Sequence, residues 1–166
     1  MARVYLLRHG DAGATIAGDP AADDARSLSP EGRAQIERLA EWMDENGEEP
    51  SEVYACPLPR TMETAKIVAK QFGLKVQPQT GLREARAGRG VITNALGDDA
   101  VSRPLFVTHD HVIVDALEAL GDDGERVDVP AKGELRILKM KRKSGEWKEK
   151  RRILPSDLDG DAADQF

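Results

Sequence analysis

Short apolar runs alternate with helix-like segments along most of this chain, and the alternation restricts the fold more than any other feature. Residues 4–7 (Val-Tyr-Leu-Leu) and 104–108 (Pro-Leu-Phe-Val-Thr) are predominantly apolar, as expected of strands covered on both faces. Between them, Ser29 and Pro30 predict the N-cap and first residue of a helix. Strands that alternate with helices predict an α/β fold, with a mainly parallel sheet between helical layers. The predicted strands are 4–7, 52–55, 75–77 and 104–108, and the helices after the one that begins at Pro30 are 58–72, 91–96 and 113–120.

The pattern changes after Gly133, where two strand-like runs follow each other directly. Residues 135–140 and 147–153 flank a Ser-Gly pair, which predicts an antiparallel hairpin. A chain of 166 residues fits one domain, and we assign residues 1–154 to it. Residues 155–166 are polar and acidic, and we expect a flexible tail there.

Two further segments are expected to be loops, because they are rich in Gly, Ala and charged residues. They are 11–26, which would cover one edge of the sheet, and 82–90.

The charge distribution and the single cysteine exclude several classes of protein. The net charge of −6 argues against general nucleic-acid binding, and Cys56 alone cannot form an intramolecular disulfide or a cysteine-rich zinc site. No run of about twenty apolar residues is present. We expect a monomeric, cytoplasmic protein that binds neither nucleic acid nor membrane.

Residues 132–152 form the basic part of the chain, with 10 basic and 3 acidic residues, which gives a charge of +7. The favoured interpretation is a solvated strand face opposed by the acidic tail. A docking face for an acidic protein substrate is the alternative.

Chemistry-bearing residues follow three of the predicted strands. Arg8 and His9 end the first strand, His109 ends the strand at 104–108, and Arg60 follows the second strand at the start of a helix. Parallel strands place their carboxyl ends at one edge of a sheet, so these side chains converge. Arg binds oxyanions through a planar pair of donors, and helix N-termini add partial positive charge. The arrangement predicts a phosphoryl site in which a histidine can be the nucleophile.

The same three segments resemble the signature blocks of the histidine phosphatase superfamily, which includes the phosphoglycerate mutases. The blocks are 7–10 (Leu-Arg-His-Gly), 56–65 (Cys-Pro-Leu-Pro-Arg-Thr-Met-Glu-Thr-Ala) and 107–109 (Val-Thr-His), in the order of the family. The resemblance implies a phosphoglycerate mutase-like fold, a three-layer α/β/α sandwich with an antiparallel C-terminal hairpin. It also implies an enzyme that needs no cofactor.

Within the superfamily, the chain most resembles the small SixA-type phosphohistidine phosphatases. It is short, without the long insertion that mutases carry after the second block, and residues 26–32 (Arg-Ser-Leu-Ser-Pro-Glu-Gly) are similar to a stretch of that group. Three positions depart from the family pattern: Ser27 replaces a proline, Cys56 replaces a serine, and Asp110-His111 follow the second histidine.

The resemblance assigns a role to each residue of the predicted site. His9 would be the nucleophile, and Arg8, Arg60 and a protonated His109 would bind the phosphoryl oxygens. Arg26 would join them.

Two of the candidate site residues have competing interpretations. For Arg26, the alternative is a loop ion pair with Asp23 or Asp24. Glu84 resembles the acid of larger family members, and its alternative is a carboxylate paired with Arg83 or Arg86.

Two residues near the site are expected to have no direct part in the reaction. The spacing of His111 from His109 predicts that the His111 side chain is turned away from that face. We expect no metal site at this pair, because further metal ligands are not evident in the sequence. Cys56 is expected to be a small turn residue.

The expected reaction is phosphoryl transfer to His9 followed by hydrolysis, with arginines in place of a metal ion. An alkoxide leaving group needs a general acid, whereas imidazole, with a pKa of about 6.5, leaves more easily. A phosphohistidine protein is therefore the favoured substrate and partner. The alternatives are a small-molecule phosphomonoesterase and a phospho-ligand binding module without turnover.

Overall fold

The computed structural model describes residues 2–98, 100–121, 127–141 and 145–163. Six strands form one sheet in the order β3-β2-β4-β1-β5-β6. Four of them are parallel, namely β1 (Arg3–Arg8), β2 (Glu52–Ala55), β3 (Val76–Pro78) and β4 (Pro104–Thr108). The hairpin of β5 (Leu135–Met140) and β6 (Trp147–Ile153) extends the sheet antiparallel to β1. The predicted α/β fold with its C-terminal hairpin is confirmed.

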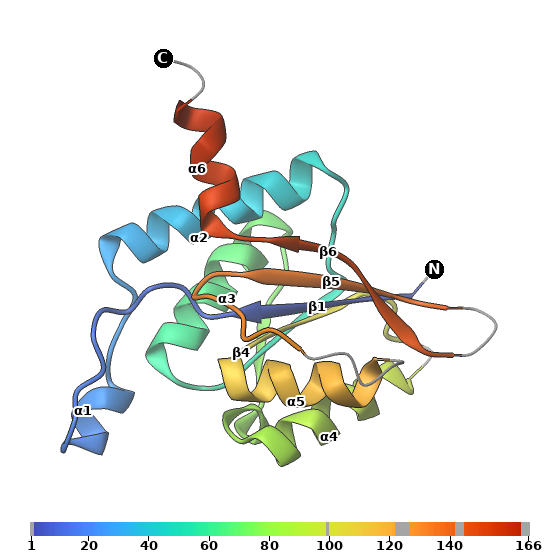
Figure 1. Ribbon diagram of the computed structural model, residues 1–166, viewed down its shortest axis with the longest axis horizontal. Coiled ribbons are helices and arrows are strands. Elements are labelled where there is room, and N and C mark those ends of the chain that lie inside the picture. The colour runs from blue at the N-terminus through green and yellow to red at the C-terminus, as the bar shows by residue number, and fades with distance from the viewer. Residues whose placement is uncertain (1, 99, 122–126, 142–144, 164–166) are drawn as a thin grey trace.

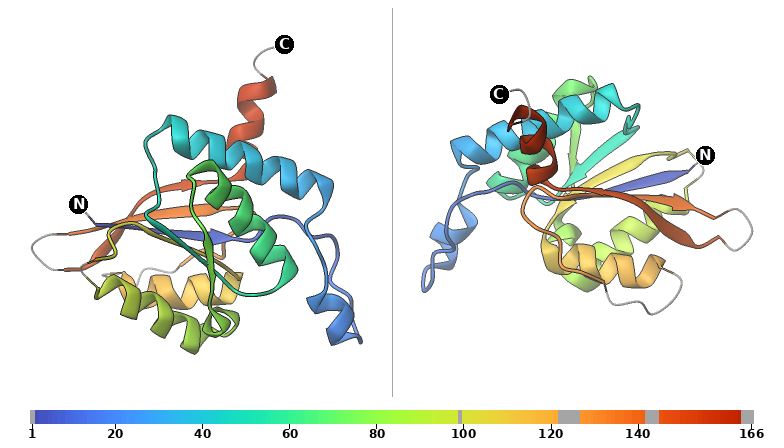
Figure 2. Two further views of the ribbon diagram at one scale, coloured as in Figure 1. Left: turned by 180° about the vertical axis from the view of Figure 1, so that it is seen from behind. Right: turned by 45° about the horizontal axis from the view of Figure 1, so that its top comes forward.

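Helices cover both faces of the sheet (Figures 1 and 2). One face carries α2 (Pro30–Glu45) and α3 (Pro59–Gln71), and the other carries α4 (Ala85–Leu96) and α5 (Asp110–Leu120). An apolar core lies on each face of the sheet, and strand β1 contributes to both, because successive side chains of a strand point to opposite faces. Tyr5 and Leu7 pack with α2 and α3, whereas Val4 and Leu6 pack with α5.

Helix α4 is the main departure from the predicted elements. The sequence predicts a loop over 82–90, but the structure has a short 3-10 helix η1 (Thr80–Arg83) followed at once by α4. The reason lies in Gly88, where a Cβ atom would overlap Cγ1 of Val112. A glycine that resembles a loop signal in the sequence therefore allows α4 and α5 to pack closely.

The segment expected to be a flexible tail contains helix α6 (Pro155–Ala163). Leu158 packs against the core beneath α2, and Arg38 of α2 lies 2.7 Å from the Asp159 carboxylate. Leu158 is the only large apolar residue of α6, and one such residue in an acidic segment is too weak a signal to predict this packing from sequence.

The loop expected over 11–26 holds one short helix, α1 (Pro20–Asp24), which is capped by the Asp19 carboxylate. No helix in the described part of the chain is long and apolar enough to span a membrane.

Candidate active site

The two signature histidines meet at the carboxyl edge of the sheet. Arg8 and Thr108 are paired residues of neighbouring strands β1 and β4, so the histidines that follow them emerge at the same level. The rings of His9 and His109 lie edge to face, with centroids 5.5 Å apart and an angle of 69° between the ring planes. Both side chains are buried. The structure therefore brings together the two histidines from segments 100 residues apart in sequence.

The His9 ring is held in one orientation by the backbone. Its Nδ1 lies 2.8 Å from the carbonyl oxygen of Gly10, and because a carbonyl only accepts, Nδ1 carries the proton. In the neutral ring, Nε2 then has a free lone pair. Burial, together with the charges of Arg60 and Arg8, lowers the pKa of His9 to about 4. The ring is therefore neutral at physiological pH.

Thr64 of α3 joins the end of β1 to the helix that carries Arg60. The N–H of Gly10 donates to Thr64 Oγ1 at 3.1 Å, and the same hydroxyl donates to the Arg60 carbonyl oxygen at 2.7 Å. Pro59 occupies the first turn of α3, where its missing N–H is tolerated. The N-terminus of α3 is thus fixed beside His9, where its partial positive charge favours an anion.

Arg60 and Arg8 each hold one guanidinium nitrogen against the backbone. Arg60 Nη1 donates to the carbonyl oxygen of Asp23 at 3.1 Å, and Arg8 Nη1 donates to that of Pro130 at 2.8 Å. The Nε–H groups of both arginines are buried without an acceptor in the described part of the chain. Burial lowers the pKa of Arg60, and the charge of Arg26 lowers it further. Buried, unmatched donors on two cations are suited to an oxyanion, which offers only acceptors.

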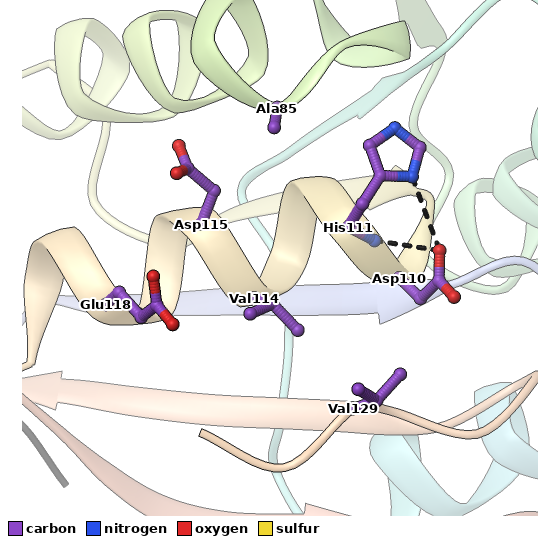
Figure 3. A pocket seen from close by; sticks show the side chains of 7 residues that line it. All are labelled: Ala85, Asp110, His111, Val114, Asp115, Glu118 and Val129. Atoms are coloured by element: carbon purple, nitrogen blue, oxygen red, sulfur yellow. Dashed lines mark hydrogen bonds and ion pairs between the residues drawn. The ribbon is translucent and has the colours of Figure 1, made fainter. Parts of the chain in front are cut away.

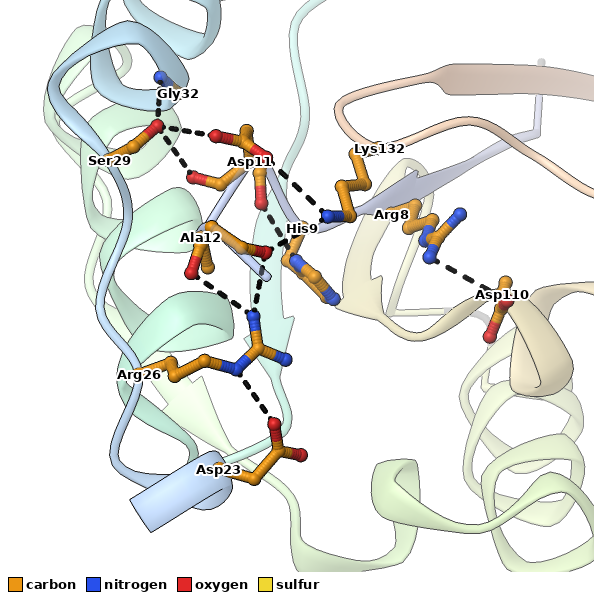
Figure 4. Close-up of polar contacts among 12 residues, drawn as sticks. Arg8, His9, Asp11, Ala12, Asp23, Arg26, Ser29, Gly32, Asp110 and Lys132 are labelled. Atoms are coloured by element: carbon orange, nitrogen blue, oxygen red, sulfur yellow. Dashed lines mark hydrogen bonds and ion pairs between the residues drawn. The ribbon is translucent and has the colours of Figure 1, made fainter. Parts of the chain in front are cut away.

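Arg26 adopts the ion-pair alternative foreseen for it. Its Nε lies 2.9 Å from Asp23 Oδ1, and its Nη1 donates to the carbonyl oxygens of Ala12 and Gly13, both at 3.1 Å (Figure 4). These contacts fix the guanidinium close enough to Arg60 to lower the pKa of that residue. Its part in binding an anion stays a prediction.

The Glu84 side chain lies outside the hydrogen-bond network of the two signature histidines. It is the N-cap residue of α4, its side chain is exposed, and it forms no side-chain hydrogen bond or ion pair in the described residues. Arg83, one of the partners considered for it, instead pairs with Asp24 at 2.7 Å. The role of Glu84 as an acid also stays a prediction.

His111 corrects an expectation from the sequence. Its ring stacks on that of His109, with centroids 5.7 Å apart and an angle of 6°, so it is not turned away. His111 Nε2 lies 3.0 Å from the Arg83 carbonyl oxygen, and its Nδ1 lies 3.3 Å from the Asp110 carboxylate. The helical spacing argument fails because His109 is the N-cap of α5 and has an extended backbone, with φ −106° and ψ 162°.

Cys56 lies against the second histidine. Its Sγ is 3.4 Å from His109 Nε2, and the side chain is fully buried. Burial raises the pKa of the Cys56 thiol, so the residue is an uncharged neighbour of the ring. Burial, together with the nearby His9 and Arg60, lowers the pKa of His109 to about 3.

Lys132 is a site residue that sequence reasoning missed. Its Nζ lies 3.5 Å from Asp11 Oδ1 and 3.3 Å from the carbonyl oxygen of Gly13, and its charge contributes to the lowered pKa of His9. The next residue, Gly133, donates its N–H to the carbonyl oxygens of Arg8 and His9 (3.1 and 3.0 Å). The only sequence signal is a lysine just before the strand that pairs with β1. Figure 4 shows this lysine reaching toward the first signature block.

Across the described residues, no three His, Cys, Asp or Glu side chains are grouped so that they could hold a metal ion. The site is instead a cationic pocket of arginines, a lysine and neutral imidazoles at helix N-termini. Such a pocket can bind a tetrahedral oxyanion and present the Nε2 lone pair of His9 to its central atom.

A comparison with protein families identifies the superfamily. Residues 4–96 fit the model of the histidine phosphatase superfamily (branch 1). That range covers more than half of the chain and includes the first two signature blocks. No curated protein matches the sequence significantly.

Several solved structures share the fold. A candidate phosphohistidine phosphatase SixA from Agrobacterium tumefaciens is 22% identical, with a TM-score of 0.76 over 93% of this chain and 98% of that chain. The protein histidine phosphatase SixA complexed with tungstate is 21% identical, with a TM-score of 0.78 over 94% and 99%. A mycobacterial glucosyl-3-phosphoglycerate phosphatase is 18% identical, with a TM-score of 0.72 over 90% and 97%. At these identities the likeness shows the fold.

Proposed function

The chain belongs to the histidine phosphatase superfamily and is a phosphatase, and we propose that it removes the phosphoryl group of a phosphohistidine protein through a covalent intermediate on His9. The observation that carries this proposal is the orientation of His9. Its Nδ1 proton is bound by the Gly10 carbonyl, and the ring faces His109 among cationic side chains. We further propose that the enzyme acts in the cytoplasm as a monomer.

In the first step, the Nε2 lone pair of His9 attacks phosphorus, and the bond from phosphorus to the substrate nitrogen breaks. The substrate ring is protonated at its other nitrogen, so it departs as neutral imidazole and needs no proton from the enzyme. Arg8, Arg60 and Arg26 bind the equatorial oxygens and balance their charge. Water then cleaves the phosphohistidine enzyme, which releases phosphate and restores neutral His9.

His109 changes protonation during this cycle. Burial and the neighbouring cations keep its pKa near 3. A phosphoryl group with two negative charges raises the pKa of a histidine beside it. The ring therefore takes up a proton when the substrate binds, and it becomes the charged partner that the family resemblance assigns to this position.

A phosphohistidine substrate fits this site better than an ester for a chemical reason. Glu84, the candidate general acid, is exposed and outside the hydrogen-bond network of the histidines. An ester needs such an acid to protonate its alkoxide, whereas imidazole is a far weaker base. The near-complete overlap with two SixA-type structures supports the same substrate class.

A small-molecule phosphomonoester is the second candidate substrate. The observation that favours it is the structural likeness to a mycobacterial glucosyl-3-phosphoglycerate phosphatase. A binding module without turnover is disfavoured, because both signature histidines and the oriented Nε2 are present.

Phosphate release from three substrate sets separates these functions: phosphohistidine peptides, sugar phosphates and nucleotides, each with EDTA and no added metal. We expect the highest kcat/KM on phosphohistidine peptides, and full activity in EDTA because the arginines supply the positive charge. A higher kcat/KM on sugar phosphates or nucleotides would favour the small-molecule alternative. Activity that EDTA abolishes and Mg²⁺ restores would reject the mechanism.

A further inference from the structure

A groove lies beside helix α5, lined by residues of α5 together with Ala85 and Val129. Its volume is about 320 Å³. Asp110 and His111 line its inner end, and both also contact the site, since Asp110 lies 3.7 Å from Arg8 and His111 stacks on His109. Two residues that line the groove are therefore also neighbours of the proposed phosphoryl site. Figure 3 shows His111 and Asp115 projecting from α5 toward Ala85, and Val114 on the side of α5 that faces Val129.

The charge of the groove is opposite to that of the phosphoryl pocket. Asp110, Asp115 and Glu118 line it, and among the residues that the structure describes no lysine or arginine is part of the lining. Asp115 lies 3.6 Å from Arg89, yet its Oδ2 is shielded from solvent and accepts no hydrogen bond in the described residues. Glu118 is exposed and has neither an ion pair nor a side-chain hydrogen bond in the part of the chain that the structure describes. Among the described residues, Glu118 is thus the carboxylate of the groove without a cationic partner.

The rest of the groove's lining includes apolar side chains. Val114 of α5 and Val129 of the segment before β5 contribute its hydrophobic surface. Val129 is 65% exposed, which is unusual for a large apolar side chain beside an active site. A ligand that combines an aliphatic stem with a cationic head would cover the valines and reach the carboxylates.

We propose that this groove binds a lysine or arginine side chain of the phosphorylated protein, close to its phosphohistidine. The proposal rests on the proposed function and specifies its substrate: a phosphohistidine within a basic segment. The substrate would be bound at two points of opposite charge. Its phosphoryl group would lie among arginines at the sheet edge, and its cation among carboxylates on α5.

The spacing of Asp110 and Glu118 along α5 sets the expected distance between the phosphohistidine and the basic residue of the substrate. Asp110 and Glu118 are separated by eight residues of α5, which corresponds to roughly 12 Å along a helix. An extended peptide covers about 3.3 Å per residue. The basic residue should therefore lie three or four positions from the phosphohistidine.

A peptide series tests this inference. Phosphohistidine peptides of equal length would carry lysine, norleucine or glutamate at the third or fourth position on either side of the phosphohistidine. Norleucine keeps the aliphatic stem and removes the charge. A further peptide with lysine eight positions away controls for non-specific attraction. The readout is kcat/KM for the wild type, Glu118→Gln, Glu118→Lys and Glu37→Gln, where Glu37 is an exposed residue of α2 on the other face of the sheet.

We expect the wild type and Glu37→Gln to favour the lysine peptide over norleucine by about two- to fivefold, the range of an exposed charge pair. The preference should disappear in Glu118→Gln and reverse toward glutamate in Glu118→Lys. Equal rates on lysine and norleucine peptides, or a preference that survives Glu118→Gln, would overturn the inference while leaving the proposed function intact. Absence of hydrolysis of every phosphohistidine peptide, with activity on sugar phosphates, would reject the proposed function and this inference with it.

Discussion

Gly32 of helix α2 lies directly against the backbone of Asp11, and a Cβ atom at Gly32 would overlap the Asp11 carbonyl oxygen. The contact is reinforced by Ser29, whose N–H donates to the same oxygen at 2.8 Å. Its hydroxyl also accepts from the N–H of Gly32 (Figure 4). The N-terminus of α2 therefore fixes the segment that follows His9. A residue with no side chain is needed here because two backbones touch.

Replacing Gly32 with alanine tests this packing. The new methyl group must push the segment at Asp11 away from α2, which displaces His9 from the arginines, and small misplacements of reacting groups reduce rates strongly. We expect kcat to fall by about 10²-fold or more. Gly90→Ala is the matched control, because nothing lies within 4 Å of a Cβ atom there and the residue is inside α4. That variant should keep its activity and gain about 0.5–1 kcal/mol in free energy of unfolding. Equal activity of the two variants would show that the contact does not position the site.

Arg60→Ala should remove a donor to the phosphoryl oxygens. The Arg60 guanidinium is buried, and its Nε–H has no acceptor in the described residues. Loss of one such donor costs about 10²–10³ in rate. Steady-state kcat for the variant measures this effect, with Lys66→Ala on the exposed side of the same helix as the control. A decrease of less than tenfold in Arg60→Ala would remove Arg60 from the proposed oxyanion site.

The edge of the sheet that carries the site is well predicted from the sequence, because the apolar runs of two strands end abruptly at polar residues. Residues 4–7 and 104–108 are predominantly apolar, and a histidine follows each run, after Arg8 in the first case and directly in the second. Neighbouring parallel strands with this pattern must place both histidines at one edge. The strand pairing and the edge-to-face contact of His9 with His109 follow from that rule.

Contacts that depend on tertiary packing are not predictable in this way. Lys132 reaches Asp11 across 121 positions, and the pattern of a basic hairpin gives no hint of this contact. Gly88 resembles a loop residue until the approach of Val112 is seen. His111 stacks on His109 because the latter caps its helix with an extended backbone. In each case the decisive interaction joins elements whose proximity is set by the whole fold.

The two buried histidines should make stability depend on pH. Burial lowers the pKa of His9 to about 4 and that of His109 to about 3, against about 6.5 in the unfolded chain. Between pH 4 and 6.5 the unfolded chain therefore binds more protons, and the free energy of unfolding falls as the pH is lowered through this window.

Chemical denaturation of His109→Gln at pH 4.5 and pH 7 measures the contribution of one ring. We expect the variant to lose less stability than the wild type on acidification, by about 1–3 kcal/mol. If His109→Gln and the wild type lose the same stability, His109 is not a buried neutral histidine.

Trapping the covalent intermediate tests the central proposal most directly. The wild type is mixed with substrate that carries a radiolabelled phosphoryl group and quenched in alkali within one turnover, because phosphohistidine is labile in acid. The labelled residue is then mapped by peptide analysis. The oriented Nε2 of His9 predicts label on His9, and loss of both label and turnover in His9→Ala. Label on Cys56 or His111, or full activity of His9→Ala, would contradict it.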